Sequence, residues 1–463
     1  MRYVRIAIVG GGPAGYEAAL MAAQLDAEVV VVDSDGIGGA CVLRDCVPSK
    51  TLIATSDTLT AFAGAPRLGV TLPEGTQPRL DLRQVNERVK GLAAAQSADI
   101  TARLAREGVE IIEGSGRLVG NGRVVVRTAE RRERGIGADA VIVATGASPR
   151  VLPGAEPDGE RILSWREVYD LTELPEHLVV VGSGVTGAEF ANAYQAMGVH
   201  VTWVSSRDRV MPSEDADAAL LLERVFTRRG MTIVKQARAA SVERTADGVV
   251  VKCEDGRTIE GSHALMAVGS TPNTDGLGLP DVGVALGAGG HVQVDRVSRT
   301  TAPGVYAAGD VTGVLPLASV AAMQGRIAVW HALGEAVTPL RLSTVAANVF
   351  TDPEIATVGL AEGEPDVGGI PARTVKLPLA TNPRAKMQGL DDGFVKLFAR
   401  PGTGTVLGGV VVSARASELI LPVSMAVQHS LTVDQLAHTF SIYPSLSGSL
   451  IEAARQLTTH APS

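Results

Sequence analysis

The segment VRIAIVGGGPAG, residues 4–15, is an apolar strand that runs into a glycine-rich turn. An alanine-rich helical stretch from Tyr16 to Gln24 follows the turn, and a second apolar strand ends at Asp33. Strand, glycine turn, helix and strand with a terminal acid, in that order, are typical of a βαβ dinucleotide-binding unit. The segment therefore predicts an α/β fold that begins with a Rossmann-like domain.

The residues of this turn have predicted roles in holding a dinucleotide. Gly10 permits the tight turn, Gly12 lets the backbone approach the pyrophosphate, and Gly15 allows close helix packing. The helix N-terminus offers N–H groups to the anion, and Asp33 is placed to accept hydrogen bonds from a ribose. The predicted contacts are Gly10, Gly12, Pro13, Ala14, Gly15 and Asp33.

A second copy of the pattern is LVVVGSGVTGAE, residues 178–189, again a strand, a glycine turn and the start of a helix. Two glycine turns of this kind predict two bound dinucleotides. The expected contacts in the second copy are Gly182, Gly184, Val185 and Gly187.

The strand after the second turn ends at Ser205 rather than at an acid, and Ser206, Arg207 and Arg209 follow. A carboxylate would repel a 2′-phosphate, whereas serine hydroxyls and a guanidinium can bind one. Ser205, Ser206 and Arg207 therefore favour NADPH, or tolerance of both nicotinamide cofactors. The alternative is that Arg207 and Arg209 are solvated surface charges.

Size and composition narrow the class of protein. A chain of 463 residues with 45% hydrophobic content should form two or three domains. A net charge of −8 and 3% aromatic residues argue against a nucleic-acid partner. The first strand starts almost at Met1, and no apolar run approaches about 18 residues. We expect a cytoplasmic protein with no integral membrane segment.

Two of the three cysteines, Cys41 and Cys46, lie close together in GGACVLRDCVPSK, residues 38–50. Three cysteines are too few for a disulfide framework, so the pair indicates catalytic, redox or metal chemistry. Pro48 fits the first turn of a helix, whose N-terminus would lower a cysteine pKa. Cys253 is expected in a strand, and we predict no metal site.

Further motifs occur in order along the chain: ATGA (144–147), VGSTPN (268–273) and VYAAGD (305–310). With both glycine turns and the cysteine segment, the chain resembles the flavoprotein disulfide reductases, the group of lipoamide dehydrogenase, glutathione reductase and mercuric reductase. The resemblance runs end to end. It implies an α/β fold with two Rossmann-like domains, for FAD and NAD(P)H, and a C-terminal α+β dimerisation domain.

The resemblance also implies a domain layout. The FAD-binding domain would span 1–150, the NAD(P)H-binding domain 151–270, a second FAD segment 271–335, and the interface domain 336–463. Residues 350–359 look like the first strand of the interface domain. A homodimer is implied.

Roles of single residues follow from the same resemblance. Cys46, nearer the flavin, would relay electrons to the more exposed Cys41, and Lys50 and Glu189 would pair beside the flavin to stabilise its reduced form. Asp310 would hold the ribitol, and Ala318 would lie along the isoalloxazine. The other implied cofactor contacts are Gly39, Ala40, Cys41, Lys50, Thr145, Gly146, Ala147, Glu189 and Gly269.

The C-terminal segment departs from the family pattern. The family brings a histidine followed by proline, with a glutamate five positions after the histidine, but Tyr443 and Gly448 occupy these positions. None of the eight histidines is followed by proline, so a shifted alignment restores nothing. His438 lies five residues before Tyr443. It is either a substitute base or a surface histidine on a helix.

The absence of this histidine and glutamate affects which electron acceptor the protein is expected to reduce. A positioned acid or base contributes about 10²- to 10⁴-fold, and tyrosine is a poor base at neutral pH. A tyrosine hydroxyl can still donate a hydrogen bond to a carbonyl oxygen that gains charge, which suits a quinone. The altered segment resembles actinobacterial lipoamide-dehydrogenase-like NAD(P)H:quinone reductases. The implied catalytic residues are Cys41, Cys46, Lys50, Glu189 and Tyr443.

Two other hypotheses stay open. The chain would be a dihydrolipoamide dehydrogenase-like disulfide reductase if an unusual proton donor served the cysteines. It would be a flavoprotein without enzymatic activity if NAD(P)H did not reduce its flavin. The physiological acceptor, the choice between NADH and NADPH, and the use of the cysteine pair in turnover are open at this point.

Overall fold

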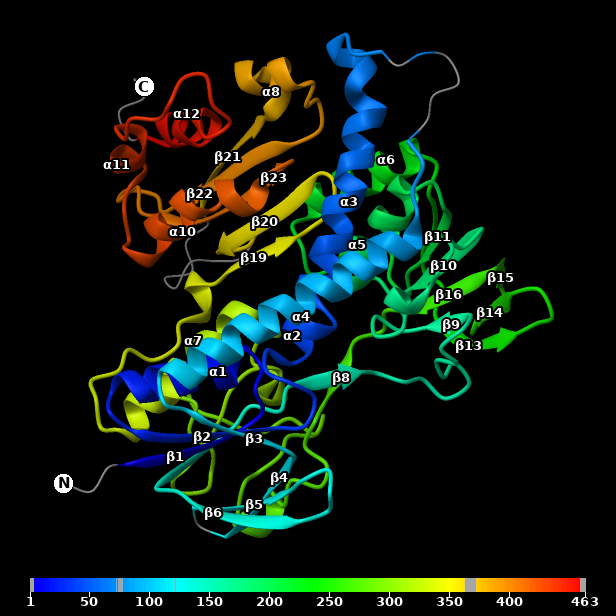
Figure 1. Ribbon diagram of the computed structural model, residues 1–463. Coiled ribbons are helices and arrows are strands. Elements are labelled where there is room, and N and C mark those ends of the chain that lie inside the picture. The colour runs from blue at the N-terminus through cyan, green and yellow to red at the C-terminus, as the bar shows by residue number, and fades with distance from the viewer. Residues whose placement is uncertain (1–3, 72, 74–77, 121, 363–371, 459–463) are drawn as a thin grey trace. The chain divides into compact units, whose positions relative to one another are not determined.

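The computed structural model describes residues 4–71, 73, 78–120, 122–362 and 372–458 (Figure 1). The chain forms two compact units, each assembled from three segments. The first unit holds Met1–Thr51, Asn86–Arg150 and Gly269–Arg341. The second holds Leu52–Val85, Val151–Val268 and Leu342–Ser463.

A parallel five-stranded sheet forms the centre of the first unit. Its strands, in spatial order, are β18 (Val305–Ala307), β7 (Ala140–Val143), β1 (Arg5–Val9), β2 (Glu28–Asp33) and β3 (Glu110–Glu113). Ile8 of β1 is in register with Val31 on one side and Ile142 on the other. Strands buried on both faces are expected to be almost continuously apolar, as β1, β2 and β7 are, whereas the edge strand β3 begins and ends with glutamate and is only partly buried.

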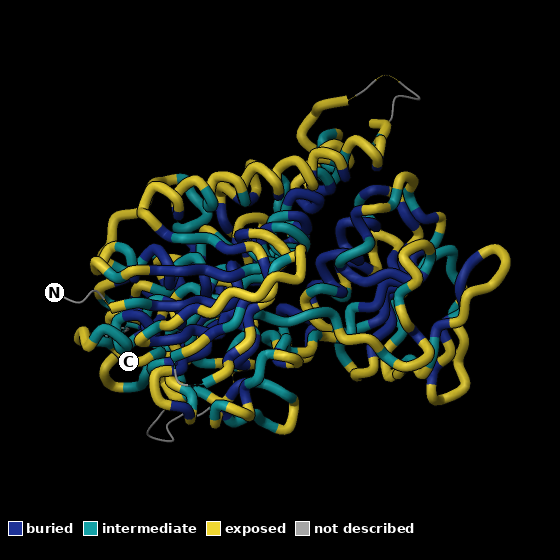
Figure 2. The backbone as a smooth tube through the Cα atoms, turned by 60° about the horizontal axis from the view of Figure 1, so that its bottom comes forward, coloured by how far each residue is buried: buried dark blue, intermediate teal, exposed yellow. Residues whose placement is uncertain are grey.

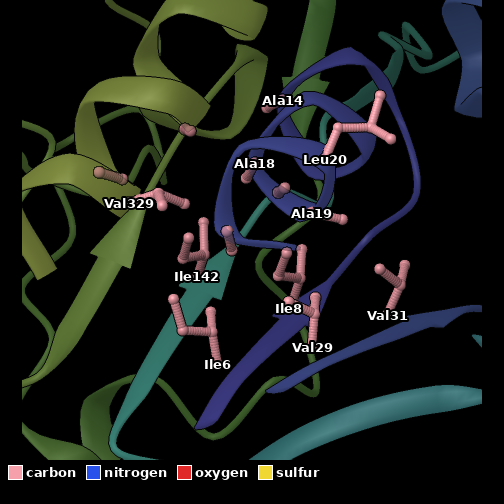
Figure 3. Close-up of a cluster of buried hydrophobic side chains, with 14 of the residues drawn as sticks. Ile6, Ile8, Ala14, Ala18, Ala19, Leu20, Val29, Val31, Ile142 and Val329 are labelled. Carbon is pink, nitrogen blue, oxygen red and sulfur yellow. The ribbon is translucent and has the colours of Figure 1, made fainter. Parts of the chain in front are cut away.

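Alternate residues of β1 and β2 pack on opposite faces of the sheet, as the pleat of a strand requires. Figure 3 shows one face, where Ile6, Ile8 and Val29 point towards helix α1 (Pro13–Gln24). The helix α7 (Ala318–Ala332) completes this layer. A Cβ on Gly325 of α7 would lie 2.2 Å from the carbonyl oxygen of Ala14, so these two helices touch through their backbones.

Smaller elements complete the first unit. An antiparallel sheet covers the other face of the parallel sheet through a second apolar cluster, and two short strands form a ribbon. They are β4 (Ser115–Gly120), β5 (Arg123–Arg127), β6 (Glu133–Gly137), β8 (Ala147–Pro149) and β17 (Ser270–Pro272). The cysteine segment contributes α2 (Gly39–Leu43) and the start of α3 (Cys46–Gly64), and α4 (Leu82–Arg106) follows.

The second unit repeats the parallel architecture. The strands of its five-stranded sheet, in spatial order, are β12 (Thr232–Val234), β11 (His200–Val204), β10 (His177–Val181), β16 (His263–Met266) and β9 (Ile162–Leu163). Helices α5 (Val185–Ala196) and α6 (Ala216–Arg228) follow β10 and β11. An antiparallel sheet of β13 (Ala239–Arg244), β14 (Val249–Cys253) and β15 (Thr258–Gly261) is attached.

The C-terminal part of the second unit is α+β. Its antiparallel sheet has the order β19 (Ala346–Val349), β20 (Glu354–Gly359), β23 (Val406–Ser413), β22 (Phe394–Ala399) and β21 (Arg373–Pro378). The helices are α8 (Pro383–Gln388), α9 (Ala416–Leu419), α10 (Leu421–Gln428), α11 (Val433–Ala437) and α12 (Gly448–Leu457). Figure 2 colours buried parts of the chain dark blue and exposed parts yellow; within this sheet, β22 is buried along its whole length, whereas the edge strand β21 has no buried residue.

The predicted fold class, two Rossmann-like sheets and a C-terminal α+β part, is confirmed. Two predicted element boundaries differ from those in the structure. The first helix begins at Pro13 rather than Tyr16, because proline fits the first helical position. The strand expected over 350–359 begins only at Glu354. Across the described part of the chain, no helix has the length and apolar character needed to cross a membrane.

Candidate active site

The first glycine turn has a backbone that only glycine allows. Gly10 has φ +109°, and a Cβ there would lie 2.2 Å from the carbonyl oxygen of Ala144. A Cβ on Gly15 would lie 1.8 Å from the carbonyl oxygen of Gly10. Gly39 also lies close to Gly12, since a Cβ on Gly39 would lie 2.8 Å from the Gly12 Cα. The predicted turn and helix-packing roles of these glycines thus have direct steric reasons.

Asp33 ends β2 and braces this turn. Its Oδ2 accepts the Gly11 N–H at 2.6 Å, and its Oδ1 accepts the N–H groups of Asp35 and Gly36, both at 2.7 Å. Burial raises the pKa of Asp33, although the three N–H groups favour its carboxylate. The carboxylate is therefore held rigidly beside the N-terminus of α1, where no side chain caps the helix.

The chain leaves the first unit after Arg150 and returns to it at Gly269. The outgoing and returning segments are hydrogen-bonded to each other through Thr145 and Asn273. The Thr145 hydroxyl donates to the Asn273 carbonyl oxygen at 2.7 Å, and the Asn273 amide donates to the Thr145 carbonyl oxygen at 2.9 Å. Gly146, with φ +67°, makes the bend, and Ala147 opens β8. Gly269, with φ +95°, precedes the returning strand β17. The ATGA and VGSTPN motifs thus form one structural feature.

Asp310 follows β18 and lies in the same unit as the first glycine turn. Gln324 of α7 holds this loop, because its buried side chain accepts the Gly309 N–H at 2.9 Å. Burial and the Asp45 carboxylate raise the pKa of Asp310, while His291 opposes them. Ala318 is exposed at the first residue of α7, a helix end that no side chain caps.

The two cysteines lie on consecutive helices, Cys41 on α2 and Cys46 at the first residue of α3. Both are partly buried free thiols joined by a side-chain hydrogen bond. That bond, burial and the Asp45 carboxylate raise the pKa of Cys46, and Lys50 opposes them. These local effects act against the lowering of the pKa that a helix N-terminus would give.

Asp45 is the residue of this site that sequence reasoning missed. Its N–H donates to the Ala40 carbonyl oxygen at 2.8 Å, and its own carbonyl oxygen accepts the Ser49 N–H at 2.7 Å. Burial raises the pKa of Asp45, and the Lys50 ammonium opposes the effect. The sequence shows that an acidic residue directly precedes Cys46. The closeness of Asp45 to Asp310 appears only in three dimensions.

The second glycine turn repeats the first. Gly182 has φ +132°, and a Cβ there would lie 2.0 Å from the carbonyl oxygen of Ala267. A Cβ on Gly187 would lie 2.5 Å from the carbonyl oxygen of Gly182, which also accepts the Trp203 indole N–H at 2.6 Å. Gly184 precedes α5, which Val185 opens without a side-chain cap. This helix end is therefore built like that of α1.

The predicted phosphate-binding residues divide into two groups. The Ser205 side chain is fully buried, and its hydroxyl accepts the Arg207 N–H at 3.1 Å, so it stabilises the turn. Arg209 donates to the carbonyl oxygens of Pro212 and Glu214 at 3.0 and 3.3 Å. Ser206 and the Arg207 side chain are exposed. Ser206 and Arg207 are therefore the predicted phosphate-binding residues whose side chains face solvent.

Glu189 and Lys50 belong to different units, so their predicted pairing stays a prediction. Glu189 is almost fully buried on α5, and its carboxylate accepts the Phe350 N–H at 3.0 Å. The Lys50 ammonium contacts the Ser49 hydroxyl at 3.3 Å, close to Cys46 in the sequence.

Tyr443 projects from the loop before α12, with 84% of its surface exposed. The residues that follow are anchored, since the Asn382 amide donates to the Ser445 carbonyl oxygen at 3.0 Å. Gly448 is the first residue of α12. His438 is exposed, and its Nδ1 lies 2.7 Å from the Asp434 carbonyl oxygen one turn earlier. That local bond favours the surface-histidine interpretation of His438.

Two protein-family models match the chain. Residues 4–325 match the pyridine nucleotide-disulphide oxidoreductase model. Residues 345–454 match the dimerisation domain of the pyridine nucleotide-disulphide oxidoreductases.

Individual relatives cover almost the whole chain. An NAD(P)H dehydrogenase (quinone) of Mycobacterium tuberculosis is 59% identical over 98% of this chain and 94% of its own length. A dihydrolipoyl dehydrogenase of Chlorobaculum tepidum is 35% identical over 97% of this chain and 96% of its own. The crystal structure of LpdA from M. tuberculosis, 59% identical, matches with a TM-score of 0.94 over 98% of this chain and 100% of that one.

Proposed function

The chain belongs to the pyridine nucleotide-disulphide oxidoreductase family, and we propose that it is an FAD-dependent NAD(P)H:quinone oxidoreductase. The feature that carries the proposal is the predicted placement of Tyr443 and Gly448 at the two positions where the family resemblance implies a histidine and a glutamate. Without that dyad, proton transfer to a disulfide substrate loses about 10²- to 10⁴-fold, whereas a quinone can take its protons from water. The 59% identical relative named as a quinone dehydrogenase supports the same acceptor.

The residues of the first unit fit FAD. The crowded glycine turn and the uncapped N-terminus of α1 suit a pyrophosphate, and Asp33 suits a ribose. Asp310 would hold the ribitol. The uncapped N-terminus of α7 at Ala318 would favour negative charge on the flavin ring. Bound FAD would supply the chemistry of accepting a hydride and passing electrons on.

The second unit would bind the nicotinamide cofactor at the N-terminus of α5, with Gly182, Gly184 and Gly187 shaping the turn. Exposed Ser206 and Arg207 would meet the 2′-phosphate of NADPH. Lys50 and Glu189 would pair beside the flavin, and Glu189 is already oriented through the Phe350 N–H. Tyr443 would donate a hydrogen bond to the quinone oxygen.

We also propose the assembly and the layout inferred from sequence. The chain would act as a homodimer through its matched dimerisation domain. The exposed side chains of Phe440, Ile442 and Tyr443 suit burial against a second copy. Residues 1–150 and 271–335 would form the FAD-binding domain, 151–270 the NAD(P)H-binding domain, and 336–463 the interface domain.

A disulfide reductase with an unusual proton donor is the second candidate. The hydrogen-bonded thiols of Cys41 and Cys46 favour it, because they form a dithiol able to exchange with a disulfide. The proposed quinone reaction does not need this dithiol.

Steady-state assays with NADH or NADPH would separate the two candidates. We expect menadione and benzoquinones to be reduced much faster than lipoamide, and Cys41→Ser to retain quinone reduction. Lipoamide turnover at rates rivalling those of the quinones, abolished by Cys41→Ser, would establish the disulfide reductase instead. Bound FAD that excess NAD(P)H fails to reduce would exclude both.

A further inference from the structure

The sheet of β4, β5 and β6 has one face packed against the parallel sheet of the first unit and the other face in solvent. Figure 1 shows it on the side of β1, β2 and β3 opposite helix α1. The inward side chains of Leu118, Val124 and Val126 are at most 1% exposed. The residues that alternate with them along β4 and β5 therefore point outward, and they are exposed or half-buried.

Arginine is the prevailing charged side chain of this sheet. Residues 115–137 contain six arginines and two glutamates, whereas the net charge of the whole chain is −8. One of the six, Arg134, pairs with Glu110 at a distance of 2.7 Å between Nη1 and Oε1. The other five are exposed, and within the described part of the chain their guanidinium groups form no ion pair. We call these five residues the arginine face: Arg117, Arg123, Arg127, Arg131 and Arg132.

Other exposed arginines of the chain are paired with carboxylates. The Nη1 of Arg244, for example, lies 3.2 Å from Oδ2 of Asp158. The carboxylates of the β4–β6 sheet are those of Glu130 and Glu133, and the Glu130 carboxylate accepts the Thr128 hydroxyl at 2.8 Å. Five unpaired guanidinium groups thus stand against two carboxylates, which leaves this surface cationic.

The turn between β5 and β6 holds two of these arginines in a fixed position. The Arg131 N–H donates to the Thr128 carbonyl oxygen at 2.9 Å, and the Thr128 N–H donates to the Arg132 carbonyl oxygen at 3.0 Å. Arg131 has φ +59°, a conformation in which glycine and asparagine are the usual residues. The geometry of the turn therefore does not account for an arginine at this position.

The surface around the arginines is open and has no aromatic side chain. Gly135 and Gly137 of β6 are in register with Val125 and Arg123, and a Cβ at either glycine would meet nothing within 4 Å. Val119, which is 39% exposed, adds an aliphatic side chain. Single-stranded nucleic acid is usually bound by stacking its bases on aromatic rings, and residues 115–137 include none. An open cationic surface with aliphatic side chains fits the headgroup layer of a bilayer.

We propose that the arginine face docks on an anionic phospholipid membrane. Guanidinium groups bind phosphate oxygens bidentately, and the surface of an anionic bilayer attracts basic residues. Docking would bring the protein to a quinone that is dissolved in the bilayer. The inference goes beyond the proposed function and does not depend on it, since membrane binding requires neither nicotinamide nor quinone.

Flotation with lipid vesicles tests the proposal on the FAD-loaded full chain. At about 0.15 M salt, where the Debye length is about 8 Å, we expect binding to vesicles of phosphatidylglycerol and phosphatidylcholine in equal amounts. Vesicles of phosphatidylcholine alone should bind none of the protein. Raising the salt concentration should release the protein from the anionic vesicles, because salt screens the attraction.

Arg123→Gln combined with Arg127→Gln should weaken vesicle binding roughly 25-fold, since each arginine near an anionic bilayer contributes about fivefold. Arg117→Gln alone should weaken it about fivefold. The matched control combines Arg88→Gln with Arg103→Gln, which removes the same charge from exposed positions of α4. This helix packs on the α1 side of the parallel sheet, so the control should bind as the wild type does.

Flavin content and menadione reduction should equal those of the wild type in every variant, which checks that the variants are folded. Three results would overturn the proposal. The first is a wild type that does not bind the anionic vesicles, and the second is equal binding by the double variant and its matched control. The third is a wild type that binds duplex DNA or polyglutamate at the same salt concentration but not the vesicles, which would assign the arginine face to another anionic partner.

Discussion

The Nζ of Lys396 lies 2.8 Å from Oδ2 of Asp215, and only 1% and 3% of the two side chains are exposed. Lys396 is on β22 of the C-terminal sheet, and Asp215 caps α6 of the nucleotide-binding part. Asp217 at 2.9 Å and Glu362 also approach the ammonium. Burial opposes the charge, but the three carboxylates overcome it and raise the pKa of Lys396. The cluster joins the two parts of the second unit.

Lys396→Met should lower the free energy of unfolding by about 3 kcal/mol, because removal of one partner leaves buried carboxylate charge uncompensated. Urea denaturation would measure the loss. Lys376→Met is the matched control, since the Lys376 ammonium pairs with Asp217 at 2.7 Å but its side chain is 44% exposed. Lys376→Met should lower the free energy of unfolding by less than about 1 kcal/mol. Equal losses in the two variants would contradict the role of burial.

Gly10→Ala should prevent stable FAD retention. The new Cβ would meet the Ala144 carbonyl oxygen at 2.2 Å in a backbone with positive φ, so the strand and the turn must separate. The flavin content of purified protein and its thermal unfolding would report the effect. Gly91→Ala, in the interior of α4 with nothing within 4 Å of the new Cβ, should retain FAD and gain up to about 1 kcal/mol. Normal flavin content in Gly10→Ala would disprove the steric argument.

Gln324→Met should weaken the loop that carries Asp310. The buried Gly309 N–H would lose its acceptor, at a cost of about 1 to 3 kcal/mol, and FAD should dissociate more readily. Fluorescence of released flavin during dilution would measure the change. Met323→Ala, at the exposed neighbouring position, should leave flavin release as in the wild type. Identical release in both variants would show that Gln324 does not position Asp310.

His177 should make the protein less stable in mild acid. Burial and His200, whose ring is stacked at 4.1 Å between centroids, lower the pKa of His177. The unfolded chain then binds the proton more tightly, so stability is present above about pH 6.5 and is lost as the pH falls towards the lowered folded pKa.

Urea denaturation across this range should show a smaller acid loss in His177→Gln than in the wild type. Each protein at about pH 8, where imidazole is neutral, serves as its own reference. The same dependence on pH in both proteins would remove His177 as the cause.

Local sequence determined the nucleotide-binding architecture. The apolar strand, glycine turn, helix and terminal acid between residues 4 and 33 predicted β1, α1 and β2 because strand and helix periodicity are properties of neighbouring residues. The start of α3 near the cysteines was also predictable from Pro48. Local reasoning did not show that the Ser205 side chain is buried and that its hydroxyl accepts the Arg207 N–H.

Sequence by itself thus determined the family, the two glycine turns and the cysteine pair, since each is written in consecutive residues. Only the tertiary structure decided the charge environment of Cys46 and the burial of Lys396. Asp45 and Asp310 lie 265 positions apart in the chain, so they interact electrostatically only after the sheet of the first unit forms. Burial and electrostatics depend on such long-range neighbours, which no local pattern specifies.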